Sequence, residues 1–312
     1  MTELVSAAAT RGYVCRYCRL GSDGSEPTCP NCGAPADVTA IRDDEGWVEQ
    51  PPVHDMARIQ FGRSTCQITG TCVPVAQMDL ATDDQIYFSH HVLLWTDPGT
   101  QLTLRPMPSA WARKKAGMPL VMLDAAGPGH IALSEDDAGE IVAVPLEAGR
   151  SVDVMEDHFL VASAAVTYSL RYTGVWWNIG TGSHVETNFP LGRYMDRFSA
   201  EHRGLLLLHA SGNTFIRDLR EDERIYLMPR ALVYKDTSVQ MNVHMERPAS
   251  PKAHWRLSQL VRVTGPGRVA IQSQYGGEEM PHWGWTGLGP DGSWRNHNAN
   301  SPTAWREKDR EP

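Results

Sequence analysis

Short runs of alternating apolar and polar residues fill the chain from about residue 55, and Gly, Asp and Pro interrupt them. Segments 139–146 (GEIVAVPL) and 238–245 (SVQMNVHM) alternate with period two, which is typical of half-buried β-strands. No segment shows the apolar spacing of a long amphipathic helix, and only 111–117 (WARKKAG) resembles a short helical turn or a basic loop. The pattern therefore predicts an all-β protein.

Three segments of this β region align with one another when they are written from Leu80, Leu146 and Leu219. A polar turn follows each leucine, and apolar residues stand at the sixth, eighth and thirteenth positions after it. These residues are Ile86, Phe88 and Leu93 in the first copy, Val152, Val154 and Phe159 in the second, and Ile225, Leu227 and Leu232 in the third. We predict three copies of a unit made of strand, turn, strand, kink and strand.

A glycine that starts a strand is the second recurring element, at Gly129, Gly204 and Gly267. The first and last of these lie in Gly-Pro-Gly turns. No further copy follows Gly267, and the start of the first unit, near residues 61–71, lacks this turn. We therefore expect the last strand to return and complete the first unit, which would remove an exposed sheet edge.

Four of the six cysteines lie in residues 15–32 (CRYCRLGSDGSEPTCPNC), as two CxxC pairs. Two such pairs can place four thiolates tetrahedrally around one metal ion. This spacing predicts a zinc ribbon, and the closed set of four ligands makes the zinc structural; iron in a rubredoxin-like site is the alternative. The predicted ligands are Cys15, Cys18, Cys29 and Cys32. The other two cysteines, Cys66 and Cys72, are expected to be small buried residues.

Changes in composition divide the chain into five parts. The predicted parts are a flexible N-terminus (1–12), the zinc ribbon (13–36), a linker (37–54), the three-repeat β domain (55–278) and a Trp-rich extended tail (279–312).

The sequence resembles the Altered Inheritance of Mitochondria protein 24 family over roughly residues 55–275. The resemblance lies in GPGHIALSEDDAGEIVAVPLEAGRSVDVMEDHFLVA, in LREDERIYLMPRALVYKDTSV and above all in VRVTGPGRVAIQSQ. It implies a threefold β-sandwich similar to subunits of the tryptophan RNA-binding attenuation protein (TRAP-like). Family members often have Gly where this chain has Asp83 or Asp222. The mitochondrial members are linked to inner-membrane architecture, and no catalytic residue can be carried over.

The net charge of −8 and the pI of about 5.8 argue against a broad nucleic-acid-binding surface. The N-terminus lacks the apolar core of a secretory signal, and no run of apolar residues is long enough to span a bilayer. The chain is therefore expected to be cytoplasmic, where thiols remain reduced.

A search for catalytic patterns finds none that is complete. The motif GxSxG and a phosphate-binding loop are absent, and Ser211 lacks the strand–turn–helix setting of a hydrolase nucleophile. Histidines in the repeat kinks and acidic clusters at turns are expected to be solvated. The residues concerned are His90, His91 and His158, with Arg230 in the third kink, the pair His184 and Glu186, and the clusters 135–137 and 221–223.

These observations favour a non-enzymatic binding or scaffolding protein with a structural zinc ribbon. An unknown protein partner or self-association is expected, and Trp283, Trp285, Trp294 and Trp305 in the tail are candidates for docking. Two alternatives remain open. One is nucleic-acid binding through the ribbon, where Arg11, Arg16, Arg19 and Arg42 supply positive charge. The other is a hydrolase or metal-dependent enzyme with its site between the β repeats.

Overall fold

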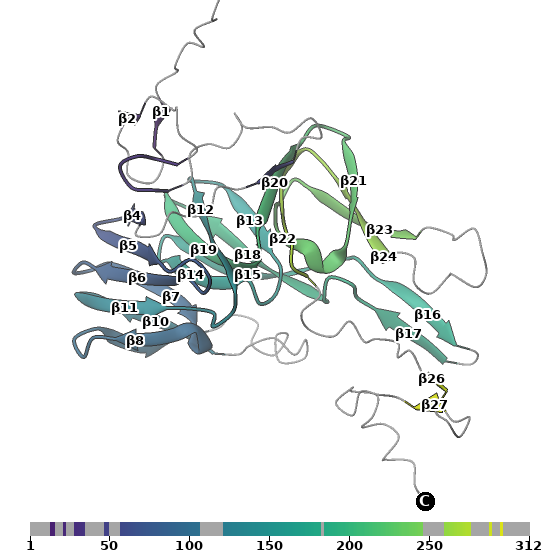
Figure 1. Ribbon diagram of the computed structural model, residues 1–312, viewed down its shortest axis with the longest axis horizontal. Coiled ribbons are helices and arrows are strands. Elements are labelled where there is room, and N and C mark those ends of the chain that lie inside the picture. Colours follow the sequence, from purple (N-terminus) through teal and green to yellow (C-terminus); the bar gives the residue numbers. More distant parts are fainter. Residues whose placement is uncertain are drawn as a thin grey trace, which may run out of the picture. The chain divides into compact units, whose positions relative to one another are not determined.

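A computed structural model gives the fold of the chain (Figure 1), which divides into two units, residues 1–273 and 274–312. The second unit contains the paired strands β26 (Gly287–Leu288) and β27 (Trp294–Arg295). The structure describes residues 13–15, 21–22, 28–34, 47–49, 57–106, 121–181, 184–245, 259–275, 287–288 and 294–295. Segments 1–12 and 111–117 lie outside the described residues, as do most of the linker 37–54 and of the tail 279–312.

The predicted all-β class is confirmed. The strands pair antiparallel, and the described residues contain no α-helix, only the 3-10 turns η2 (His90–Val92) and η3 (Pro229–Ala231). Five short strands precede the repeats: β1 (Tyr13–Val14), β2 (Gly21–Ser22), β3 (Val48–Glu49), β4 (Ala57–Phe61) and β5 (Ser64–Thr69).

The threefold repeat is also confirmed, and each copy contains six strands. The first repeat consists of β6 (Val75–Leu80), β7 (Gln85–Ser89), β8 (Leu93–Thr96), β9 (Gln101–Leu104), β10 (Met122–Ala126) and β11 (Gly129–Leu133). The second consists of β12 (Gly139–Leu146), β13 (Ser151–Val154), β14 (Phe159–Ser163), β15 (Val166–Tyr172), β18 (Tyr194–Ala200) and β19 (Gly204–Ser211), with the hairpin β16 (Trp177–Thr181) and β17 (His184–Asn188) inserted before β18. The third consists of β20 (Thr214–Leu219), β21 (Arg224–Leu227), β22 (Leu232–Asp236), β23 (Gln240–Met245), β24 (Gln259–Thr264) and β25 (Gly267–Gln272).

One pairing scheme serves all three repeats. The sixth strand lies between the first and the third, as in β6–β11–β8, β12–β19–β14 and β20–β25–β22. The fifth strand lies between the second and the fourth, as in β7–β10–β9, β13–β18–β15 and β21–β24–β23. Each repeat therefore contributes two three-stranded pieces.

The expectation that the last strand completes the first unit is wrong. Strand β25 pairs with β20 and β22 of its own repeat, and β11 completes the first repeat. The strand that starts at each glycine is thus the last strand of one repeat, not the first strand of the next.

Neighbouring repeats share sheets, because the third strand of one pairs with the second strand of the repeat before it. Strand β14 pairs with β7, and β22 pairs with β13. The result is a six-stranded sheet (β12-β19-β14-β7-β10-β9) and a seven-stranded sheet (β15-β18-β13-β22-β25-β20-β3). A five-stranded sheet (β4-β5-β6-β11-β8) and a three-stranded sheet (β21-β24-β23) hold the remaining pieces (Figure 1).

The recurring glycines allow a close approach between the start of the sixth strand and the chain after the third strand. A Cβ atom at Gly129 would lie 2.3 Å from Thr100 Oγ1, and one at Gly267 would lie 2.5 Å from Ser238 Oγ. A Cβ atom at Gly204 would meet Val166 at the same distance of 2.5 Å. The repeated glycine is therefore required by packing in all three copies.

Three groups of buried apolar side chains fill the body. In β19, Leu205 and Leu207 belong to the group shared with the five-stranded sheet, whereas Leu206 and Leu208 belong to the group shared with the seven-stranded sheet. The alternation of side chains along a strand explains this division. The unbroken run of four leucines is thus a strand buried on both faces.

A buried ion pair joins the second and third repeats. Lys235 on β22 lies opposite Asp153 on β13, with 2.9 Å between Nζ and Oδ2, and Arg197 donates to the same carboxylate at 2.6 and 3.0 Å. Burial alone would raise the pKa of Asp153, but the hydrogen bond from Arg197 and the charge of Lys235 outweigh it, so the pKa is lowered. The carboxylate is held ionised at the junction.

We predict that Asp153→Ala lowers the free energy of unfolding by about 3–5 kcal/mol, because it leaves the Lys235 ammonium buried without its carboxylate. Urea denaturation measures the loss. The control is Asp218→Ala, which removes the partner of Arg268 in a more exposed pair and should cost about 1 kcal/mol or less. If the two variants lost the same free energy of unfolding, the larger contribution predicted for the buried ion pair would be wrong.

Candidate functional site

Three of the four predicted ligands come together. The sulfur atoms of Cys15, Cys29 and Cys32 all lie within 4.8 Å of one another, and those of Cys15 and Cys32 are 3.7 Å apart. Metal–sulfur bonds of about 2.3 Å in a tetrahedron place two sulfurs about 3.8 Å apart, so these cysteines are close enough together to bind one metal ion. The fourth predicted ligand, Cys18, lies outside the described residues.

A tight turn prepares the second cysteine pair for this arrangement. The Cys29 amide donates to Ala34 O at 2.7 Å, and the Gly33 amide donates to Cys29 O at 2.7 Å. Gly33 has φ 68°, which a residue with a side chain rarely adopts. The turn brings Cys29 and Cys32 to one side, where they can serve as a pair of ligands.

The cysteine cluster is packed on the β body. The Arg58 amide of β4 donates to Cys32 O at 2.8 Å. The three cysteines and Ala34 are buried in the same apolar group as Ile59 and Ile68 of the five-stranded sheet. The cysteine cluster is therefore attached to the edge strand β4.

The two remaining cysteines differ from each other. Cys66 is fully buried in β5, and burial raises the pKa of its thiol, so the prediction of a small buried residue is confirmed. Cys72 is exposed in the loop after β5, so the same prediction is wrong there.

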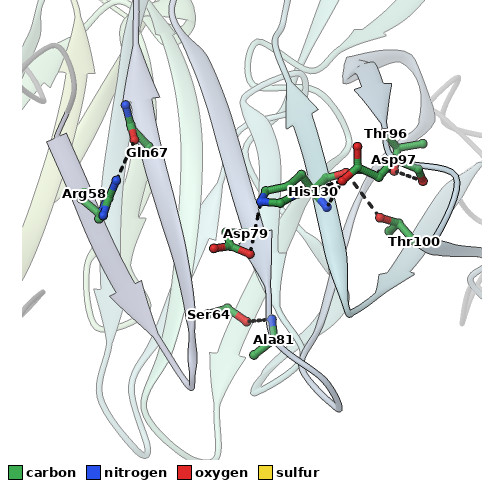
Figure 2. A network of polar contacts seen from close by, with 9 residues as sticks. All are labelled: Arg58, Ser64, Gln67, Asp79, Ala81, Thr96, Asp97, Thr100 and His130. Carbon is green, nitrogen blue, oxygen red and sulfur yellow. Dashed lines mark hydrogen bonds and ion pairs between the residues drawn. The ribbon is translucent and has the colours of Figure 1, made fainter.

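Figure 2 shows a polar network on the five-stranded sheet that the sequence search missed. His130 Nδ1 lies 2.8 Å from Asp97 Oδ2, and His130 Nε2 lies 3.5 Å from Asp79 Oδ1. Hydrogen bonds from the His130 side chain and backbone lower the pKa of Asp97. Thr96 and Thr100 both donate to His130 O. A histidine held by a carboxylate can act as a general base. Whether His130 serves catalysis or the fold therefore has to be judged from the equivalent positions of the other repeats.

Equivalent contacts in the other repeats decide that role. The His130 amide donates to Asp97 Oδ2 at 3.1 Å, the Arg268 amide donates to Asp236 Oδ2 at 2.9 Å, and the Leu205 amide donates to Ser163 Oγ at 3.0 Å. In each case the donor follows the repeat glycine and the acceptor stands at the seventeenth position after the repeat leucine. We call this hydrogen bond, from the residue after the repeat glycine to the side chain at the end of the third strand, the glycine clamp. In the first repeat Asp97 is the acceptor, and the His130 side chain adds a second contact to the same carboxylate.

Glu135 lies in a second polar group, at the end of the first repeat. Its Oε1 is 3.2 Å from His91 Nε2, and its Oε2 is buried without a hydrogen-bond partner. Burial, with the charges of Asp157 and Asp137, raises the pKa of Glu135 to about 7. The expectation of solvated charge is therefore wrong for Glu135.

His158 and His209 lie close to this group. His158 Nδ1 contacts His209 O at 2.8 Å, and burial lowers the pKa of His158 to about 4. Burial likewise lowers the pKa of His209, whose Nε2 has no hydrogen-bond partner. The expectation of solvation is thus wrong for His158, and both rings are neutral at pH 7.

The other sequence candidates do not form a site. Ser211 Oγ contacts Asp137 Oδ2 at 3.4 Å, and Glu223 accepts from Arg217 and from the Arg220 amide. These bonds lower the pKa of Glu223, with the Arg220 amide as the largest cause. His184 and Glu186 are in β17 of the inserted hairpin. Within the described parts of the chain, only Cys15, Cys29 and Cys32 bring three ligand atoms close enough to one another to hold one metal ion.

Comparison with known families identifies the β body. The family described as Mitochondrial biogenesis AIM24 matches residues 66–274. The chain belongs to this family. The resemblance predicted from the repeat motifs is therefore confirmed, and the match excludes the cysteine-rich segment and the tail 279–312.

A solved structure agrees with this family membership. The AIM24 body is similar to a Streptococcus pyogenes protein determined by X-ray crystallography, with 16% sequence identity and a TM-score of 0.52. The similarity covers 68% of this chain and 94% of the streptococcal chain, and it shows the fold alone. A search of the curated proteins finds no match. Among the described residues, no helix is long and apolar enough to cross a membrane.

We predict that Glu135→Gln removes a pH-dependent loss of stability. The folded state keeps a proton on Glu135 up to about pH 7, whereas the unfolded chain releases it near its ordinary pKa, so the free energy of unfolding falls between those values as pH rises. From pH 5 to pH 8 the wild type should lose up to about 3 kcal/mol relative to the variant. Urea denaturation at several pH values measures this difference. Asp136→Asn, at an exposed neighbour, should keep the wild-type profile; parallel profiles for wild type and Glu135→Gln would contradict the prediction.

Proposed function

We propose that the chain is a non-enzymatic binding or scaffolding protein. Its three-repeat body presents surfaces to other molecules, and a structural zinc ribbon is attached to its first sheet. We assign the zinc to Cys15, Cys18, Cys29 and Cys32. Reduced thiols of this kind fit a cytoplasmic protein.

The threefold recurrence of the glycine clamp is the observation that supports a non-enzymatic role. The contact between His130 and Asp97 has counterparts at Asp236 and Ser163, where no histidine is present. A polar contact that recurs with different side chains in every repeat serves the fold. The group around Glu135 contains two neutral histidines, and the Ser211 hydroxyl contacts the Asp137 carboxylate only at 3.4 Å, so we infer a structural role for this group.

Zinc is supported by the burial of the thiols. The three cysteines are buried in an apolar group with their sulfur atoms within 4.8 Å of one another, which is the setting of a closed metal site. A zinc ion would stabilise the thiolates, and four sulfur ligands would leave no open position for substrate. The metal would therefore hold the ribbon together and would take no part in a reaction.

Neither rival function gains support. The arginines that favoured nucleic-acid binding lie outside the described residues, and the net charge of −8 opposes a broad phosphate-binding surface. A metal-dependent enzyme between repeats needs a second ligand set, and the described residues of the β body offer none.

We predict one zinc per chain in the purified protein and none in the double variant Cys15→Ser plus Cys29→Ser, because the double variant removes half of the ligands. Elemental analysis measures zinc and iron together. The matched control is Cys72→Ser, which alters an exposed cysteine and should keep the zinc.

Two metal ions per chain, or one ion that survives in the double variant, would overturn the structural-only assignment. Iron in place of zinc would overturn the choice of metal alone. Circular dichroism of the double variant should still show the β body, because that body has its own cores.

A further inference from the structure

Among the described residues, only the second repeat has a hairpin between its fourth and fifth strands. Strand β15 ends at Tyr172, the hairpin β16–β17 follows, and β18 starts at Tyr194 (Figure 1). Hydrogen bonds tie the two ends of the insertion together, because the Thr173 amide donates to Arg193 O at 3.1 Å and Thr173 Oγ1 donates to Gly192 O at 3.0 Å. The base of the insertion is therefore a fixed part of the body.

Buried side chains anchor this base in the core. Val175 and Leu191, one from each side of the insertion, are 1% and 0% exposed. They lie in the apolar group that also contains Val261 and Val263 of the third repeat. Trp176 directly follows the first anchor and is nevertheless 47% exposed. A large apolar side chain is thus held at the surface by a well-packed backbone.

Further aromatic rings gather at the same base. Tyr172 is 45% exposed, and its ring meets those of Phe189 and Tyr194 edge-on, at centroid distances of 6.4 and 5.9 Å. The Arg193 guanidinium lies 5.2 Å from the centre of the Phe189 ring. Because each ring is supported by a neighbour, a partner that binds here loses little side-chain entropy. We call the following residues the aromatic strip: Arg171, Tyr172, Trp176, Phe189, Arg193 and Tyr194.

Two arginines give the aromatic strip a positive charge. Arg171 and Arg193 are both exposed, and neither has a carboxylate partner among the described residues. Several other arginines of the body do pair with an aspartate or a glutamate: Arg105, Arg150, Arg197, Arg217 and Arg268. Aromatic residues and arginine are also the residue types that are enriched at protein–protein interfaces. Unpaired arginines beside exposed rings therefore favour a partner with acidic and apolar side chains.

Strand β15 has an open edge beside the strip. It stands at one end of the seven-stranded sheet and pairs with β18 alone among the described residues. Its seven residues (VTYSLRY) contain no proline and a single charge, at Arg171, whereas the edge strand β12 of the six-stranded sheet contains Pro145. An unprotected edge of this kind can pair with an extended segment of another protein.

We propose that the aromatic strip and the edge of β15 together bind an extended acidic segment of a partner protein. The segment adds a strand beside β15, its carboxylates meet Arg171 and Arg193, and its apolar side chains pack on Tyr172 and Trp176. This inference rests on the proposed scaffolding function and names the chemistry of the partner. A peptide fits better than a nucleic acid, because an open strand edge pairs with a peptide backbone and a net charge of −8 repels a long polyanion.

The first test measures the fluorescence anisotropy of short labelled peptides with the full-length protein. A peptide in which glutamate and valine alternate should bind, and one with lysine in place of glutamate should bind about tenfold or more weakly. The double variant Arg171→Glu plus Arg193→Glu should weaken binding of the acidic peptide by a similar factor. Its matched control, Arg58→Glu plus Arg224→Glu, makes the same change in net charge at exposed arginines of other sheets and should bind as the wild type does.

The second test separates the aromatic contact from the strand pairing. Trp176→Ser should weaken binding of the acidic peptide, whereas Trp95→Ser, at a tryptophan of similar exposure in the five-stranded sheet, should not. Saturation with the peptide should also slow hydrogen exchange of the β15 amides in the wild type, because some of them gain a partner. Circular dichroism verifies that each variant is folded.

Failure of the acidic peptide to bind the wild type overturns the proposal, as it would if another segment of the same chain covered the strip. Equal effects of the arginine variant and its control, or unchanged exchange of the β15 amides, overturn it as well. If oligothymidine binds in place of the peptide and is lost in the same arginine variant, the strip belongs to a nucleic acid and the peptide is rejected.

The zinc experiment is independent of these results. A peptide that fails to bind a chain with one zinc rejects this site alone. A second metal ion in a chain that still binds the peptide rejects the non-enzymatic assignment alone.

Discussion

The hydrogen bond between the start of the sixth strand and the end of the third holds each repeat together. The sixth strand has to enter between two others, and at its first residues the ladder is incomplete, so a backbone N–H there needs a partner. Asp97, Ser163 or Asp236 supplies the acceptor, and the repeat glycine lets the backbone come close enough to use it. The sixth strand pairs with both the first and the third strand of its repeat, so a contact that fixes the start of the sixth strand helps to position all three.

Shared sheets make the repeats interdependent. The four leucines of β19 face two different sheets, and the buried pair of Lys235 and Asp153 spans two repeats. The stability of each repeat therefore depends on contacts with its neighbours, as in other repeat proteins. The first and third repeats each have a neighbouring repeat on one side alone, whereas the second has one on both sides. The first strands of the outer repeats are covered, since β5 pairs with β6 and β3 pairs with β20.

Sequence patterns predicted the class, the repeat and the cysteine cluster, because all three depend on local spacing. The assignment of the last strand failed because the pairing of β25 with β20 and β22 is non-local, and chain order does not show which repeat a strand completes. The burial of Glu135 and His158 and the exposure of Cys72 depend on neighbours from distant segments. The clamp at Asp97 did leave a signal: the repeat alignment, extended to the seventeenth position, places Asp97 with Asp236.

The cysteine cluster contacts β4 of the five-stranded sheet, and β8 is the strand at the other end of the same sheet. In the order β4-β5-β6-β11-β8, the Arg58 amide of β4 donates to Cys32 O, so the cysteine cluster lies at one end of the five strands. The three buried sulfur atoms there lie close enough together to bind a metal ion. The hydrogen bond from Arg58 to Cys32 satisfies one of the backbone groups that an edge strand otherwise leaves open. Strand β8, at the opposite end of the order, pairs with β11 alone among the described residues.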